Sequence, residues 1–175
     1  PGSRIRTVTK ATYTGAAGSL KGYELTGLNL SSPTVLTASW YDTHAFVGDV
    51  LGETFSASDT TLLYGTPVAV SSGLQTGSWS AVLGNADGIA ANGLWSVIRY
   101  DRRNRVAKTV STDHDGGRTV EDVAYTFRGS PLQRHIVHTD AQGRSFTEDN
   151  VFTYDHEERL LTQTHSLDGS DPVAL

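Results

Sequence analysis

The chain has 175 residues and a formal net charge of -5, which argues against nucleic acid as a partner because binding phosphates requires a concentrated positive surface. It has no cysteine, hence no disulfide or thiolate chemistry, and no apolar run approaches the roughly 20 residues of a membrane-spanning helix. Glycine is frequent, with 18 residues, and long runs of strong helix formers are missing, which together predict an all-β fold.

The first part of the chain, residues 1–93, has the pattern of an irregular β-rich segment that precedes a repeated region. No methionine is present even at position 1, so we expect a fragment or a processed chain. Short apolar stretches between Gly and Ser clusters favour strands, and residues 20–30 alternate without showing which face is buried. Residues 49–61 should form a long loop that either covers the sheet or lies free of it, and residues 85–93 a second loop. We expect the boundary between this segment and the repeated region at Gly93.

Three similar segments follow within residues 94–175, and each has the pattern of a β-hairpin. Their anchoring aromatics are equally spaced, by 27 residues, at Tyr100, Phe127 and Tyr154. Two positions before each anchor stands another large apolar residue, which is the period of a strand. After each anchor an aliphatic residue begins the return strand, one residue earlier in the middle unit than in the other two. The residues before the anchors are Ile98, Tyr125 and Phe152, and those after them are Val106, Leu132 and Leu160.

The turns of two units contain residues that suit a left-handed backbone. Asn104 and Gly129 adopt a positive φ at little cost, whereas Glu158 does not, so the third turn should differ in type. Because a single hairpin is marginal in water, three in series predict one continuous, curved antiparallel sheet. Its open edges should let the isolated chain self-associate or pair with another chain.

Two Tyr-Asp dipeptides, each followed by an arginine and an aliphatic residue, stand in the first and third units. They are Tyr100-Asp101 with Arg105-Val106, and Tyr154-Asp155 with Arg159-Leu160. This pattern resembles the YD repeat of the Rhs family, which has Tyr-Asp, two variable residues, Gly, Arg and an aliphatic residue. The middle unit keeps Phe127, Gly129 and Leu132 of it. The HDGGR link and the closing YDHEERLL segment are most similar to Rhs-like proteins of Bacteroidetes.

The resemblance implies a role as well as a fold. YD repeats wind as a long β-sheet into a hollow shell of a large secreted or cell-surface protein. This chain would then be a non-catalytic structural segment of a shell that encloses or presents a toxin or effector domain. Its partners would be neighbouring YD-repeat segments of the same or another chain and a toxin cargo, with no cofactor.

An alternative function is a carbohydrate-binding or adhesion β-module. Flat aromatic rings stack on sugars, and the candidates are Trp40, Tyr41, Trp79 and Trp95. The competing interpretation is that these rings are buried in the sheet.

Acidic residues that follow a tyrosine are the first candidates for catalysis. They are Asp42, Asp101 and Asp155, and a glycosidase needs two carboxylates that face each other across a sugar. One acid per repeated unit is better explained by a short side chain that accepts a turn amide. A hydrolase that uses Asp42 and His44 in the first part of the chain is a third possibility.

Histidines and arginines predict no metal or phosphate site. His135 and His138 lie three apart, so on a strand they point to opposite faces and cannot share an ion. No nucleophile elbow, P-loop or dinucleotide motif is present. The densest basic cluster is interrupted by Asp101 and has the pattern of a solvated turn; it comprises Arg99, Arg102, Arg103 and Arg105. We therefore predict no catalytic, metal or cofactor-binding residue.

Overall fold

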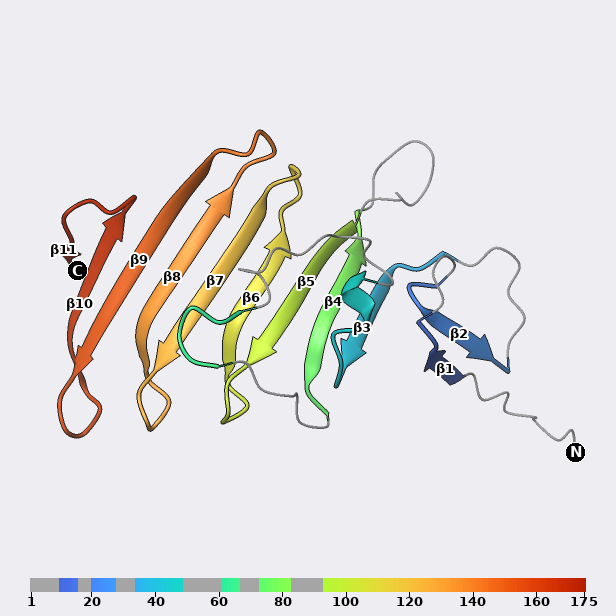
Figure 1. Ribbon diagram of the computed structural model, residues 1–175, viewed down its shortest axis with the longest axis horizontal. Helices are drawn as coiled ribbons and strands as arrows, with labels where there is room; N and C mark the ends of the chain where they lie inside the picture. Colours follow the sequence, from blue (N-terminus) through green and yellow to red (C-terminus); the bar gives the residue numbers. More distant parts are fainter. Residues whose placement is uncertain (1–9, 16–19, 28–33, 49–60, 67–72, 83–92) are drawn as a thin grey trace, which may run out of the picture.

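The structure, a computed structural model, describes residues 10–15, 20–27, 34–48, 61–66, 73–82 and 93–175, and the regular secondary structure of this part is almost all strand (Figure 1). A small antiparallel sheet pairs β1 (Lys10–Tyr13) with β2 (Tyr23–Thr26), the strand expected within residues 20–30. Nine further strands form one open antiparallel sheet in chain order, which confirms the all-β prediction. They are β3 (Thr37–Tyr41), β4 (Gln75–Ala81), β5 (Gly93–Tyr100), β6 (Val106–Thr112), β7 (Arg118–Tyr125), β8 (Pro131–Thr139), β9 (Ser145–Tyr154), β10 (Leu160–Leu167) and β11 (Val173–Ala174).

The predicted hairpins are the pairs β5–β6, β7–β8 and β9–β10, and the sheet runs on through the expected boundary. Strand β4 pairs with β5, with Ala81 opposite Gly93, so the sheet is continuous there. Strands β3 and β4 add a further hairpin. The series of consecutive antiparallel hairpins is therefore confirmed, and it begins earlier in the chain than the sequence repeat suggested.

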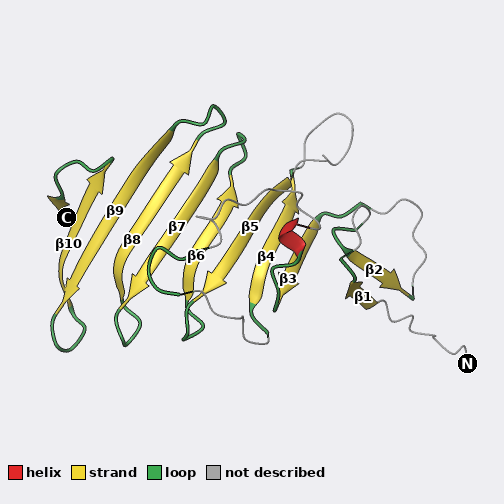
Figure 2. Ribbon diagram, in the orientation of Figure 1, coloured by secondary structure: helices red, strands yellow, loops and turns green. Residues whose placement is uncertain are grey.

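One face of the sheet, called here the covered face, carries the hydrophobic core. Alternate residues of a strand point to the same side, so neighbouring strands line up their apolar side chains there. Phe46 comes from the short helical turn after β3 (Figure 2) and stacks its ring 4.4 Å from the ring of Trp40. Within the described residues, the core cluster contains six buried side chains, Trp40, Phe46, Trp79, Trp95, Val97 and Val110.

Two glycines make room for aromatic rings on this face. A Cβ atom at Gly77 would overlap the phenyl ring of Phe46, and one at Gly93 would overlap the indole of Trp79. Both glycines lie within strands, where the missing side chain lets a ring rest directly on the backbone. Glycine at these two positions therefore serves packing.

Residues 61–66 cross the covered face beside the core. Leu62 is buried, and the amide of Leu63 donates to Oδ1 of Asp122 at 2.9 Å. Oδ2 of the same carboxylate accepts from Nζ of Lys108 at 2.8 Å, and both charged side chains are nearly buried. A charge pair removed from water needs such hydrogen bonds. The loops expected over 49–61 and 85–93 lie, except for their last residues, outside the described residues.

The C-terminal strands form a single layer in the described part of the chain. Among the hydrophobic side chains of β8 to β11, only Ile136 is buried. Several large ones are more than a third exposed, so no core comparable with the covered face exists there; they include Leu132, Phe146, Val151, Leu160, Leu161 and Leu167.

Candidate functional site: repeated turns and an adjoining cleft

An arginine clasp holds the turns after β5 and β9. Oδ1 of Asp101 accepts from the amides of Arg103 and Arg105 at 2.8 and 3.0 Å, and Oδ2 accepts from Nε of Arg105 at 2.7 Å. Asp155 makes the same three bonds with the amides of residues 157 and 159 and with Nε of Arg159, at 2.9, 2.9 and 2.7 Å. The predicted role of these aspartates as turn formers is confirmed.

The same clasp also closes the turn between β8 and β9. Oδ1 of Asp140 accepts from the amides of Gln142 and Arg144, and its Oδ2 accepts from Nε of Arg144 at 2.6 Å. This turn was not singled out in the sequence analysis. Its signal was present, because Asp140 and Arg144 have the same spacing as the other two pairs.

Glu158 occupies the left-handed position of the third turn, which corrects the prediction that this turn differs in type. Its φ is 63°, against 59° for Asn104 in the first turn. The closing bonds also agree, since the amide of Glu158 donates to the carbonyl of Asp155 at 3.0 Å, as that of Asn104 does to Asp101. The Glu158 carboxylate accepts from Thr126 Oγ1 at 2.9 Å, a contact that offsets the strain of its backbone.

The middle unit has a turn of the same length, so its predicted alignment is wrong. Tyr125 lies opposite Pro131, as Tyr100 lies opposite Val106 and Tyr154 opposite Leu160. The anchor of this unit is therefore Tyr125, and the spacings become 25 residues (100 to 125) and 29 residues (125 to 154).

Phe127, the predicted middle anchor, instead lies at the tip of the β7–β8 turn and is 81% exposed. The guanidinium of Arg103 lies 3.7 Å above its ring, and the arginine also donates to the Phe127 carbonyl. Thr126 replaces the aspartate here, and its Oγ1 accepts from the amides of Gly129 and Ser130 at 3.1 Å each. Gly129 has the positive φ predicted for it.

A tyrosine staple ties each of these hairpins to the strand before it. The hydroxyl of Tyr100 donates to the carbonyl of Gln75 at 2.6 Å, that of Tyr125 to Val106 at 2.7 Å, and that of Tyr154 to Pro131 at 2.7 Å. Each acceptor is the first residue of the preceding strand in the sheet. The three tyrosines therefore join separate hairpins into one array.

The β3–β4 hairpin has the same framework around a much longer connection. A register shift of the kind found at Tyr100, Tyr125 and Tyr154 occurs at Tyr41, which lies opposite Gln75. The amide of Asp42 donates to the carbonyl of Leu74 at 3.0 Å, and its carboxylate accepts from the amide of Gly73. Residues 43–73 thus take the place of a short turn.

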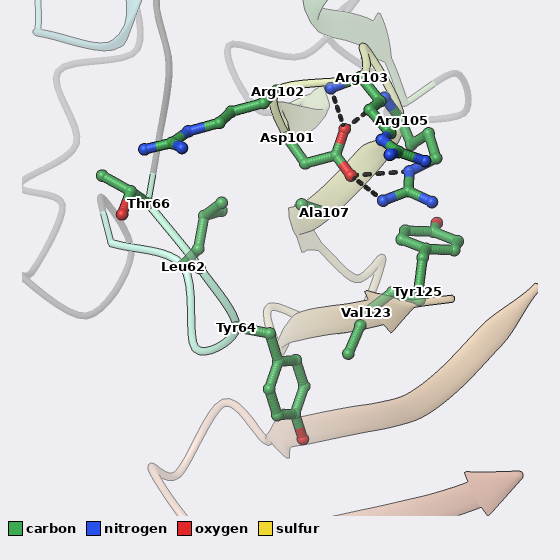
Figure 3. Close-up of a pocket in the computed structure, with 12 residues that line it drawn as sticks. Leu62, Tyr64, Thr66, Asp101, Arg102, Arg103, Arg105, Ala107, Val123 and Tyr125 are labelled. Atoms are coloured by element: carbon green, nitrogen blue, oxygen red, sulfur yellow. Dashed lines mark hydrogen bonds and ion pairs between the residues drawn. The ribbon is translucent and has the colours of Figure 1, made fainter. Parts of the chain in front are cut away.

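A cleft of about 470 Å³ lies between residues 62–66 and the β5–β6 turn (Figure 3). Leu62, Tyr64 and Ala107 line it, and Arg102 extends beside Thr66 at its margin. The other arginines of the basic cluster are engaged, because Arg105 pairs with Asp101 and donates to the carbonyl of Thr126 at 2.8 Å. The cleft is therefore mixed in character: Asp101, Arg103 and Arg105 line it together with the apolar side chains.

Hydrogen bonds keep the clasp carboxylates ionised. Burial raises the pKa of Asp101, but hydrogen bonds from the side chain and amide of Arg105 outweigh it, and the pKa lies below its usual range. The pKa values of Asp140 and Asp155 are also lowered, first by the amide four residues ahead. These carboxylates are hydrogen-bonded through both oxygens and stabilise the turns.

The histidines of β8 make separate contacts. Nδ1 of His135 lies 2.6 Å from Oδ1 of Asp149, whereas His138 bonds Thr119 at 3.0 Å and stacks on Phe146. No group of three or more acidic and histidine side chains that could hold a metal ion occurs in the described ranges.

The aromatic candidates for sugar binding and the candidate His44 are mostly buried. Trp40, Trp79 and Trp95 are 2%, 5% and 8% exposed, so their faces are covered, whereas Tyr41 is 51% exposed. Nε2 of His44 lies 2.8 Å from the carbonyl of Ile98, and burial is the main cause that lowers its pKa.

No protein-family model, curated protein or solved structure matches this chain. Within the described residues, no helix has the length and apolar character to cross a membrane.

Proposed function

We propose that this chain is a non-catalytic structural segment of a large secreted or cell-surface YD-repeat protein. In that role it forms part of a β-shell that encloses or presents a toxin or effector domain. The observation that carries the proposal is the tyrosine staple, which recurs at Tyr100, Tyr125 and Tyr154 and each time joins one hairpin to the strand before it.

The staple supports an array because it acts between hairpins. A hairpin of this kind depends on its predecessor for the acceptor carbonyl, so stability grows with the number of units in the series. The clasps at Asp101 and Asp155 support the same function, since the tyrosine and the aspartate of each Tyr-Asp pair have distinct structural tasks. The tyrosine joins its hairpin to the preceding strand, and the aspartate closes the turn of the hairpin.

The carbohydrate-binding alternative has less support in the described residues. Of its four aromatic candidates, only Tyr41 offers an exposed ring. A glycan array tests it directly: saturable binding that is lost in Tyr41→Ala would favour the binding module over the shell segment.

Internal duplication of residues 118–144 tests the array. It inserts a second β7–β8 hairpin and its following turn between residues 144 and 145. We expect a folded chain with a single urea transition and a larger dependence of unfolding free energy on urea, because more surface is buried. The control insertion contains the same residues in scrambled order. A duplicated hairpin that is cleaved by protease as fast as the scrambled one would contradict the array.

The coding sequence on either side provides a second test. Further Tyr-Asp units and a variable C-terminal domain are expected there. A reading frame that ends near Leu175 with no further unit would favour a binding module.

A further inference from the structure

The cleft beside the β5–β6 turn has the size of a ligand-binding site and takes no part in the proposed function. Its volume of about 470 Å³ lies within the range of roughly 300 to 1,000 Å³ in which proteins bind small molecules. Residues 62–66 form one wall and the turn after β5 forms the other (Figure 3). Ala107 from β6 and Val123 from β7 also line it.

Both walls of the cleft are held in place by contacts within the chain. On one side Leu62 is buried, and the amide of Leu63 donates to Asp122 at 2.9 Å. On the other side the clasp closes the turn, and Arg105 donates to the carbonyl of Thr126 at 2.8 Å. A ligand that enters a cleft between two anchored segments does not have to order them, so the site is preorganised.

The charged side chains of the lining favour an anion. Three arginines and one aspartate line the cleft. Both oxygens of Asp101 already accept hydrogen bonds from the turn, and Arg105 forms an ion pair with it. Arg103 lies over the ring of Phe127 and donates to its carbonyl. Among the described residues, Arg102 is then the lining cation that has no hydrogen-bond or ion-pair partner.

Arg102 and Thr66 form a polar end of the cleft. Both residues are exposed, and Arg102 extends beside Thr66 at the margin (Figure 3). A guanidinium carries five N–H donors in a planar fork that matches a carboxylate, and the threonine hydroxyl adds a further donor. The apolar part of the lining is supplied by Leu62, Ala107 and Val123. The cleft therefore combines donors for one anionic group with apolar surface.

We propose that this cleft binds a small organic acid, with its carboxylate on Arg102 and its apolar body against Leu62 and Ala107. A carboxylate is planar and carries a single charge, so one guanidinium without another partner is enough to pair with it. A phosphate monoester carries nearly two charges at pH 7 and calls for more than one such cation. The site goes beyond the structural role of the chain, and failure of the site would leave that role intact.

Nuclear magnetic resonance titration of the full chain with phenylacetate tests the proposal. We expect saturable shifts of the amide signals of residues 62–66 and 102–105. Replacement of the probe by the neutral phenylacetamide, or of the protein by Arg102→Gln, should each weaken binding roughly tenfold, because each removes the charge-assisted hydrogen bonds. The control Arg128→Gln changes an exposed arginine in the next hairpin turn and should leave binding unchanged. Thr66→Trp places a large ring at the margin of the cleft and should abolish the shifts.

Several results would overturn the proposal. The absence of saturable shifts at the lining residues would exclude the site, and equal affinity in Arg102→Gln and Arg128→Gln would exclude the role of Arg102. Shifts that persist in Thr66→Trp would place the binding outside the cleft. Phenyl phosphate is the last probe: if it binds more tightly than phenylacetate and its binding is lost in Arg102→Gln, the choice of a carboxylate is wrong.

Discussion

The sheet has two halves that share one hairpin design and differ in what stabilises it. From β3 to β7, Phe46 and residues 61–66 lie over the covered face, and a core of tryptophan and valine forms beneath them. From β8 to β11, the described residues form a single layer with one buried hydrophobic side chain. Because staples and clasps occur in both halves, the hairpin geometry is set by local contacts, and the core adds stability to it. Five pairs of variants follow: three compare the two halves, and two compare a contact with a control in the same half.

Removal of a core ring should separate the halves most strongly. We expect Trp40→Ala to lower the free energy of unfolding by about 4 kcal/mol, because it leaves a cavity beneath Phe46. Leu161→Ala, in the open half, should change it by less than about 0.5 kcal/mol, since the side chain is exposed. Urea unfolding followed by tryptophan fluorescence and by circular dichroism measures both. Equal losses would show that the open half contains a core of its own.

Removal of one partner from the buried ion pair should cost nearly as much. Asp122→Ala leaves Lys108 charged and buried and the amide of Leu63 without its acceptor, so we expect a loss of about 3 kcal/mol. Asp149→Ala breaks the more exposed contact with His135 and should cost less than about 1 kcal/mol. The double variant Lys108→Met with Asp122→Leu should recover the part of the stability that is lost to the unpaired charge, although the amide of Leu63 still lacks its acceptor. A double variant as unstable as Asp122→Ala would contradict the explanation by an unpaired charge.

A methyl group at Gly77 should displace the aromatic cover. We expect Gly77→Ala to cost about 2 kcal/mol, because its Cβ overlaps the phenyl ring of Phe46. Gly48→Ala is the matched control, since no atom lies within 4 Å of the added Cβ. Thermal unfolding of the two variants compares them. Equal melting temperatures would mean that Phe46 repacks freely and that the cover is loosely held.

The staples should differ in strength between the halves. Tyr100→Phe leaves the Gln75 carbonyl next to a buried ring without a donor, and we expect a loss of about 1.5 kcal/mol. At Tyr154, which is less buried, water replaces the hydroxyl, so Tyr154→Phe should cost about 0.5 kcal/mol. Hydrogen exchange at the neighbouring strands adds a local readout. A larger loss at Tyr154 than at Tyr100 would reverse this order.

Acid should weaken the clasps in both halves alike. Their aspartates have pKa values lowered by folding, so the stability they give is present above the unfolded-state pKa, near 3.9, and is lost as the pH falls through the folded-state value. We expect Asp155→Asn to lose stability at pH 7 but to be less sensitive to acid between about pH 4 and 2. Asp171→Asn is the control. The same acid sensitivity in Asp155→Asn and in the parent chain would exclude this contribution.

Local patterns predicted the hairpins better than they predicted the alignment of the units. The alternation before Tyr100 and Tyr154, followed by an aspartate and an arginine, located both turns correctly. The choice of Phe127 as the middle anchor was wrong. Its aromatic ring and the equal spacing favoured it, but the loops between hairpins differ in length, so the true spacing is unequal. The prediction that the third turn differs in type was wrong, because the strain of the positive φ at Glu158 is offset by a hydrogen bond from Thr126, a residue of another hairpin.

The sequence pattern did not predict contacts between segments that lie far apart in the chain. Nothing local in Leu63 or Asp122 indicates that one donates to the other across 59 positions. The β3–β4 hairpin was missed for a similar reason, since Asp42 and Leu74 close a turn whose intervening residues hide the pairing. Only the Tyr-Asp dipeptide at position 41 hinted at it.

The expanded β3–β4 turn has a consequence for how such a chain evolves. Tyr41 and Asp42 keep the register and the closing bond although residues 43–73 stand where other hairpins have a short turn. The entropy of closing a loop grows only slowly with its length, so an insertion at a turn costs little once the bonds on both sides hold. Each turn of the array is therefore a permissive insertion point. New covers and binding loops can be acquired there while the strands beneath keep their pairing.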